Sequence, residues 1–173
     1  MRKLSPILLS LFFIISCTKE VDFNQISDIE ISPVVESSLI FFTASANDFI
    51  QNNQEVSLSP DFIEVDVFNN SFVNDNVNKV DLVFETENTL PRDFSFSIDF
   101  FSENGQFLEN FTFLTTEASP HVITFEDTNL RLIKNTSVLL FSLTMLNGDL
   151  LSDTTEGRIA LKSKAVFYFN IEG

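Results

Sequence analysis

Asp93-Phe94-Ser95-Phe96-Ser97-Ile98-Asp99-Phe100 decides the fold, because polar and apolar side chains alternate through the whole stretch. In an extended chain, successive side chains point to opposite faces, so this stretch has one polar face and one apolar face. The pattern predicts a β-strand that turns one face to a hydrophobic core and the other to water, as strands of antiparallel sheets do.

A turn signal follows this strand at Asn104-Gly105. Asn-Gly favours a two-residue type I′ hairpin, whose central residues both need positive φ. Such a turn fixes the register of the returning strand and pairs apolar with apolar and polar with polar side chains. The predicted pairs are Glu103 with Gln106 beside the turn, Phe100 with Glu109 near the tip, and then Asp99 with Asn110, Ile98 with Phe111, Ser97 with Thr112 and Phe96 with Phe113.

Shorter alternating or apolar runs predict further strands on both sides of this hairpin. The stretch 158–171 is the longest, and its length indicates a central position in a sheet. A second Asn-Gly, at Asn147-Gly148, predicts a second hairpin with Leu150 opposite Met145. The other expected strands cover 28–31, 38–43, 63–67, 80–85, 121–125 and 139–145.

Two segments predict short helices instead. Residues 127–134 carry a capping residue at Asp127 or Thr128 and end at Lys134. A similar short helix is predicted over residues 46–50. Strands spaced by turn signals predict an all-β fold, an antiparallel β-sandwich of immunoglobulin-like shape with one or two short helices. The Cys-Trp-Cys and tyrosine-corner markers of true immunoglobulin domains are absent from the sequence.

The composition restricts what such a domain binds. The chain has 173 residues and a net charge of −15, with 21 phenylalanines, no tryptophan and one tyrosine. So acidic a surface repels phosphate backbones and anionic headgroups, and no nucleic-acid partner is expected. Because sugar-binding platforms favour Trp and Tyr, whose rings carry a polar group, we expect the phenylalanines to fill the core.

The N-terminus has the layout of a secretory signal: Arg2 and Lys3 precede the apolar run 4–16, and Cys17 follows this run directly. The run is too short to span a bilayer, which needs about 20 residues. Ile14-Ile15-Ser16-Cys17 resembles the bacterial lipobox, which implies cleavage before Cys17 and acylation of its sulfur. Acyl chains on the only cysteine would anchor the protein stably. Removal of 1–16 leaves 8 basic and 25 acidic side chains, a net charge of −17.

The domain organisation follows from this resemblance. Residues 1–16 are the predicted signal peptide, 17–25 the lipidated cysteine and tether, and 26–173 the β-sandwich. Thr18 is not the aspartate that favours retention in the inner membrane, so the resemblance implies the outer membrane, on its periplasmic or cell-surface face. The chain resembles lipoproteins of Bacteroidota, and Asp153-Thr154-Thr155 is similar to the O-glycosylation motif of that phylum, which makes Thr154 a candidate acceptor.

Candidate catalytic residues are few. His121, the only histidine, begins a strand after Pro120 and is expected to be a surface residue rather than a base. The pairs Glu85 with Glu87 and Glu64 with Asp66 each stand two apart, so each pair is expected on one strand face. A glycosidase needs two such acids across a sugar cleft, but outward acidic faces are the more common origin of this spacing.

No cofactor and no metal site are expected. Asn74-Asp75-Asn76-Val77-Asn78 offers oxygen ligands at alternate positions, as a calcium loop would, but lacks the glycine and bidentate acid of the EF-hand. An asparagine-rich turn is the preferred interpretation.

Three classes of function remain, the last of them a carbohydrate-active enzyme that would use carboxylates. The first is a non-enzymatic envelope lipoprotein that acts as an interaction or accessory module with a protein partner. The alternative is a small-ligand or cation-binding protein that serves an outer-membrane transporter.

Overall fold

The alternating stretch forms strand β7 (Arg92–Phe101). Phe94, Phe96, Ile98 and Phe100 are buried, and the side chains between them are partly or fully exposed, as predicted. The computed structural model describes residues 30–172, and residues 31–171 form one compact unit, to which the following description refers. The predicted signal, tether and boundary at residue 26 lie outside the described residues.

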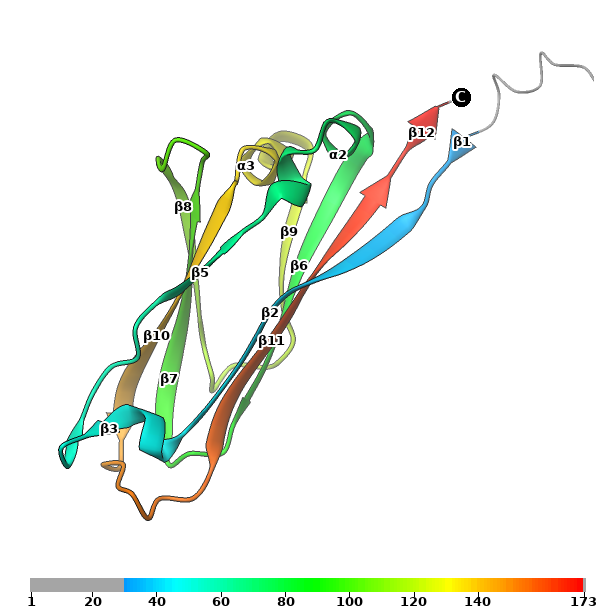
Figure 1. Cartoon of the computed structure of the whole chain (residues 1–173). Helices are drawn as coiled ribbons and strands as arrows, with labels where there is room; N and C mark the ends of the chain where they lie inside the picture. The colour runs from blue at the N-terminus through cyan, green and yellow to red at the C-terminus, as the bar shows by residue number, and fades with distance from the viewer. Residues whose placement is uncertain (1–29, 173) are drawn as a thin grey trace, which may run out of the picture. The chain divides into compact units, whose positions relative to one another are not determined.

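The elements follow one another along the chain with short connections (Figure 1). The strands are β1 (Glu30–Ile31), β2 (Val34–Ser45), β3 (Ile50–Gln51), β4 (Gln54–Glu55), β5 (Asp61–Glu64), β6 (Val77–Asn88), β7, β8 (Phe107–Leu114), β9 (His121–Glu126), β10 (Val138–Gly148), β11 (Arg158–Phe169) and β12 (Ile171–Glu172). The helices are η3 (Ala46–Phe49), η4 (Asp66–Asn69), α2 (Ser71–Asn76), η5 (Asp127–Asn129) and α3 (Leu130–Lys134).

Two four-stranded antiparallel sheets make the sandwich, with the orders β2-β11-β6-β9 and β5-β10-β7-β8. Numbered along the chain, these eight strands have the orders 1-8-3-6 and 2-7-4-5, which is the jelly-roll arrangement. The predicted antiparallel all-β sandwich is therefore confirmed. The two packed sheets agree with the predicted immunoglobulin-like layers, whereas the strand order is that of a jelly roll.

Phenylalanine fills the space between the sheets, as predicted. Eleven phenylalanine side chains of the described residues are buried, and several ring pairs join one sheet to the other. Phe100 of β7 lies 5.8 Å from Phe125 of β9, and Phe84 of β6 lies 5.6 Å from Phe113 of β8, measured between ring centroids. Tilted ring pairs at such distances are favourable beyond the area that they bury.

The first predicted hairpin is confirmed in its register and wrong in its turn. Five of the six predicted pairs are present, whereas the predicted pair of Glu103 with Gln106 is wrong, because Gln106 stands opposite Ser102. The turn is longer than two residues, because Gly105 N donates to Ser102 O at 2.9 Å and Ser102 N donates to Gln106 O at 2.9 Å. Within this turn, only Gly105 has a positive φ, of 73°. This is a three-residue turn closed by a glycine bulge. A second irregularity, after Phe100, restores the register.

The second predicted hairpin is wrong. β10 pairs with β5 and β7, whereas β11 lies in the other sheet between β2 and β6. Gly148 closes on Arg92 of β7 instead of turning back, and a Cβ atom there would lie 2.7 Å from Arg92 Cα. Leu150 does not reach Met145 and is exposed. The predicted central position of the last long strand is confirmed, since β11 has a partner on each side.

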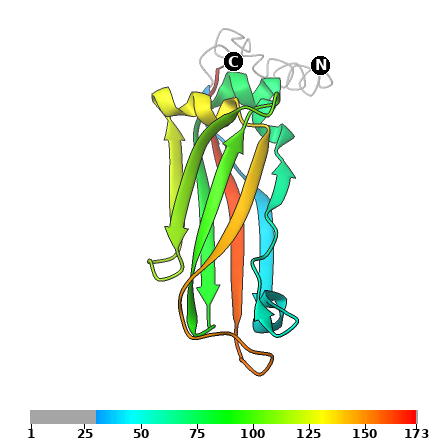
Figure 2. The ribbon, with the colours of Figure 1, turned by 90° about the vertical axis from the view of Figure 1, so that its left-hand side faces the viewer.

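Both predicted short helices are present, as η3 and as η5 with α3. The structure adds η4 and α2, which the sequence did not predict as helices. The strand expected over 63–67 is wrong beyond Glu64, because η4 begins at Asp66. Figure 2 shows α2 and α3 together at one end of the sandwich, with the β10–β11 connection at the other.

Candidate functional site

Basic side chains gather on one face of the sandwich. We call the outward side of the sheet β2-β11-β6-β9 the charged face; it carries Lys79, Arg158, Lys162 and Lys164, four of the ten lysines and arginines of the chain. In the four strands of the other sheet, Arg92 is the only basic residue. The two faces therefore differ in the charges that they offer a partner.

Exposed ion pairs surround the middle of the charged face. Lys164 Nζ lies 2.9 Å from Glu36 on β2, and Arg158 Nη2 lies 3.0 Å from Glu87 on β6. Because both partners of each pair are largely in water, these pairs contribute little to folding stability. They remain available for exchange with a partner's charges.

Lys162 occupies the middle of this face. It stands opposite Phe41 on β2 and opposite Glu85 on β6, and within residues 30–172 it forms no ion pair shorter than 4 Å. Phe41 is 66% exposed, more than any other described phenylalanine. Aromatic side chains such as Phe41 are enriched in protein interfaces, whereas lysine is depleted from their centres, so Phe41 is the more telling of the two residues.

A β-bulge shapes this region. Leu39 and Ile40 of β2 stand opposite the single residue Ser163 of β11. Ser163 Oγ accepts a hydrogen bond from Ile40 N at 3.0 Å and donates one to Ile40 O at 3.3 Å, which fixes the irregularity. Bulges redirect neighbouring side chains and often stand beside functional sites. A hollow of about 220 Å³ between Ser38, Lys162 and Lys164 lies over this bulge.

Asp81 anchors a polar cluster at the other end of the charged face. Thr124 Oγ1 donates to Asp81 Oδ1 at 2.7 Å, and Lys79 Nζ lies 3.1 Å from its other oxygen. Burial alone would raise the pKa of Asp81, but the hydrogen bonds from Thr124, Lys79 and Tyr168 favour the charged form, so its pKa lies below the ordinary value. The hydrogen bond to Asp81 in turn raises the pKa of Tyr168. The cluster is a fixed charged feature rather than a proton donor at neutral pH.

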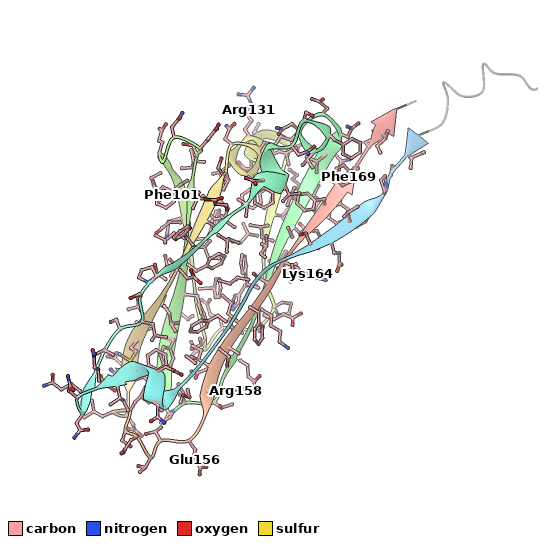
Figure 3. All side chains as sticks on the ribbon, in the orientation of Figure 1. Phe101, Arg131, Glu156, Arg158, Lys164 and Phe169 are labelled. Atoms are coloured by element: carbon pink, nitrogen blue, oxygen red, sulfur yellow. The ribbon has the colours of Figure 1, made fainter. Side chains whose placement is uncertain are left out.

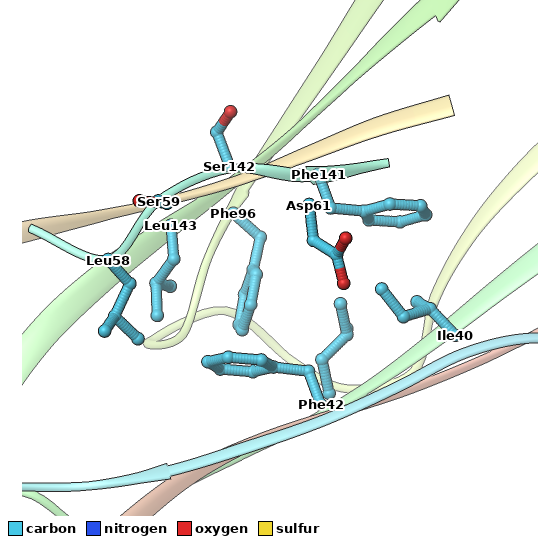
Figure 4. A pocket seen from close by; sticks show the side chains of 10 residues that line it. Ile40, Phe42, Leu58, Ser59, Asp61, Phe96, Phe141, Ser142 and Leu143 are labelled. Carbon is cyan, nitrogen blue, oxygen red and sulfur yellow. The ribbon is translucent and has the colours of Figure 1, made fainter. Parts of the chain in front are cut away.

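A small apolar hollow opens between the edge strands of the two sheets (Figure 4). Ile40, Phe42 and Leu58 line it, and the Asp61 carboxylate points toward it. Its volume of about 30 Å³ suffices for a water molecule. Small-molecule sites are roughly ten times larger, so this hollow is not a ligand site.

The structure keeps one of the two predicted acid pairs on one strand face and separates the other. Glu85 and Glu87 do share the outward face of β6, as predicted, but Glu87 is paired with Arg158. The prediction for Glu64 and Asp66 is wrong, because Glu64 ends β5 and Asp66 begins η4. Neither pair has the arrangement of two acids facing each other across a cleft.

His121 faces the interior rather than the surface, contrary to the prediction. Its ring stacks on Phe113 with 4.4 Å between centroids, and Nδ1 lies 3.9 Å from Glu117 Oε2. Within the described residues, its buried Nε2 has no hydrogen-bond partner. The stack places the ring between β8 and β9, which are edge strands of the two sheets.

The asparagine-rich segment is not a loop. Asn74, Asp75 and Asn76 are the last residues of α2, and Val77 begins β6. Asn76 Nδ2 donates to Phe72 O at 2.8 Å, and Lys134 Nζ donates to Asn74 O at 2.6 Å. Within residues 30–172, no group of three or more His, Cys, Asp or Glu side chains has an arrangement that would hold a metal ion.

The two predicted modification sites have different outcomes. Thr154 is exposed in the β10–β11 connection, and its Oγ1 lies 3.0 Å from Ser152 Oγ, so it is accessible at the surface. Cys17 lies outside the described residues. None of the helices between residues 30 and 172 is long and apolar enough to cross a membrane.

Sequence reasoning missed the charged face. The signal was present in part, because Arg158, Lys162, Lys164 and Tyr168 stand at even positions of the last long strand. That spacing puts them on one face. What the sequence did not show was which strands lie beside them.

Comparison with known proteins gives only distant likeness. No family model and no curated protein matches the chain. A solved structure of the infectious bursal disease virus VP2 subviral particle is similar over 85% of this chain and 34% of its own, with 13% identity and a TM-score of 0.34. A solved structure of the T13 particle of the same virus is similar over 80% of this chain and 35% of its own, with 13% identity and a TM-score of 0.30. The chain spans about a third of these proteins, and likeness at this level supports no conclusion about its function.

Proposed function

We propose that this protein is a lipid-anchored, non-enzymatic module of the bacterial outer membrane that binds a protein partner through its charged face. The single observation that carries the binding surface is the position of Lys162 beside exposed Phe41, in the middle of the sheet face that is richer in basic residues. The anchor rests on the sequence from Arg2 to Cys17.

The chemistry of the charged face favours a protein over other partners. Alternating Lys and Glu side chains are complementary to a partner surface that carries both signs of charge. A uniformly anionic partner is disfavoured, because the Glu side chains repel it. Phe41 supplies an apolar anchor that would lose its water in a complex. An acidic chain is repelled by nucleic acid.

Binding is favoured over catalysis by the surroundings of the candidate catalytic groups. Glu87 is neutralised by Arg158, and His121 is packed against Phe113. A general base needs hydrogen-bond reach to a substrate proton, and a stacked ring inside the core lacks that reach.

Photo-crosslinking tests the surface. A photoreactive phenylalanine at Phe41 in the full chain, expressed in its bacterial envelope, is expected to give a discrete crosslinked product, and the further change Lys162→Glu is expected to remove it. Phe62 is the matched control, because it is 62% exposed but lies on the other sheet. The same product from both positions, or none from Phe41, would contradict the proposal.

A further inference from the structure

Exposed apolar side chains gather at the end of the sandwich where β2 begins. We call Ile31, Val34, Val35, Val67 and Phe72 the apolar end; each of these side chains is between 38% and 56% exposed. Single exposed apolar side chains are common on protein surfaces, but a cluster of them marks a contact site for another molecule or for a membrane.

These residues surround the end of β11. The Phe72 ring lies 5.5 Å from Phe169, and Phe169 N donates to Pro33 O at 3.1 Å. Val34 and Val35 stand opposite Tyr168 and Phe167, the last residues of β11 before Phe169. Figure 3 labels Phe169 at this end of the sandwich and Glu156 at the opposite one. Phe72 of α2, the start of β2 and the end of β11 therefore lie together, with Val34 and Val35 on opposite faces of β2 because they are consecutive in the strand.

The route of the chain connects this end to the proposed anchor. Residues 18–30 separate Cys17 from Ile31, where the sandwich begins. Thirteen residues span at most about 45 Å, and the chain enters the sandwich at the apolar end. Arg131 is exposed on α3 at the same end, and a guanidinium group suits a lipid phosphate.

From these observations, and resting on the proposed function, we infer that the apolar end contacts the lipid surface and holds the sandwich upright on its anchor. The lipid is a zwitterionic phospholipid such as phosphatidylcholine or phosphatidylethanolamine, because the chain from Cys17 onward, with 8 basic and 25 acidic side chains and a net charge of −17, is repelled by anionic headgroups. A contact too weak to bind free protein suffices here, since the anchor keeps the surface close to the bilayer.

This orientation has a consequence for the partner. The β10–β11 connection lies at the end of the sandwich opposite α2 and α3 (Figure 2), so in the proposed orientation it would point away from the membrane, and the charged face would stand along the side of the sandwich. A partner would then approach the charged face parallel to the membrane plane.

Tryptophan fluorescence tests the inference, because the chain contains no tryptophan of its own. The chain from Cys17 onward is coupled through its single thiol to a maleimide lipid in phosphatidylcholine vesicles. Phe72→Trp reports on the apolar end, and Leu150→Trp reports on the far end as the matched control, since Leu150 is 78% exposed. Both positions are at the surface, so each variant is expected to fold.

The expected result is a shift of the Phe72→Trp emission to shorter wavelength and a loss of its intensity in vesicles of brominated phosphatidylcholine, with neither change for Leu150→Trp. Adding Val34→Asp and Val35→Asp to the Phe72→Trp chain is expected to abolish both changes, so that the emission has the wavelength and intensity of the protein without vesicles. Equal quenching at both positions, or none at position 72, would overturn the inference. Because the coupling is chemical, this outcome is independent of whether cells acylate Cys17.

Discussion

Thr124 Oγ1 on β9 donates a hydrogen bond of 2.7 Å to Asp81 Oδ1 on β6 and so joins an edge strand to its neighbour through side chains as well as through the backbone. The carboxylate is largely shielded from water and also lies 3.1 Å from Lys79. Losing a partner of such a group costs about 1–3 kcal/mol.

The first prediction concerns the pH dependence of stability. Burial opposes ionisation of Asp81, but its hydrogen bonds hold its pKa below the ordinary value. Such a group stabilises the fold above its unfolded pKa of about 3.9 and loses that contribution as the pH falls through its folded pKa. Asp81→Asn should therefore lower the free energy of unfolding at pH 7, and the difference from the unaltered chain should shrink below about pH 4.

Urea denaturation at several pH values checks this prediction. Thr124→Val should show the same trend with a smaller amplitude, because only one of the hydrogen bonds is lost. Curves for the Asp81→Asn variant and the unaltered chain that stay parallel from about pH 7 to about pH 3 would show that Asp81 does not carry the effect.

The second prediction compares two glycines. Gly105 has φ of 73° with open space around it, whereas a Cβ at Gly148 would lie 2.7 Å from Arg92 Cα and 2.9 Å from Pro91 O. Gly105→Ala should cost about 1 kcal/mol, the usual cost of the left-handed conformation. Gly148→Ala should cost about 3 kcal/mol or more, because backbone must move. Equal melting temperatures for the two variants would be inconsistent with the close approach of β10 to β7.

The third prediction concerns the ion pair that closes the end of the sandwich opposite α2. Arg92 Nη1 lies 2.7 and 2.9 Å from the two carboxylate oxygens of Glu55, and Glu55 also accepts from Leu151 N at 2.8 Å. Both side chains are less than a fifth exposed. Glu55→Gln should lower the free energy of unfolding by about 2 kcal/mol, since hydrogen bonds to a charged group are lost.

Glu87→Gln is the control for that measurement, because Glu87 pairs with Arg158 in water. It should cost less than about 1 kcal/mol. If chemical denaturation gives the two variants the same stability, the contacts of Glu55 with Arg92 and Leu151 do not stabilise this end of the sandwich more than an exposed ion pair would.

The fourth prediction concerns the phenylalanines. Phe100 is fully buried between the sheets, and Phe41 is exposed on the charged face. Phe100→Ala should cost about 3–5 kcal/mol through lost burial and an unfilled cavity. Phe41→Ser should change stability by less than about 0.5 kcal/mol while removing partner binding. A large loss of stability in Phe41→Ser would assign that ring to the fold rather than to an interface.

The β7–β8 hairpin shows what local sequence determines. Its partners are close along the chain, and alternation from Phe94 to Phe100 allows a single register with apolar facing apolar. The turn itself differs from the prediction, but two irregularities cancel and leave that register intact. Hydrophobic pairing thus outweighs the preference of Asn-Gly for one turn type.

The second Asn-Gly shows where local sequence fails. Gly148 serves a close approach to Arg92 on a strand more than fifty residues earlier, which no turn propensity reveals. The charged face was missed for the same reason, since Lys162 meets Phe41 and Glu85 only after β11 inserts between β2 and β6. α2 was missed because so short a helix has too short an apolar pattern, although Asn70 caps it by accepting from Phe72 N at 2.9 Å.

The most direct test of the account is the fate of Cys17. Intact mass and membrane partition are measured for the full chain and for Cys17→Ala after expression in a bacterial host. We predict that the unaltered protein loses residues 1–16, gains the mass of acyl chains and enters the membrane fraction, while Cys17→Ala does none of these. Identical mass changes and identical partition of the two proteins would contradict the lipid anchor and the envelope function built on it.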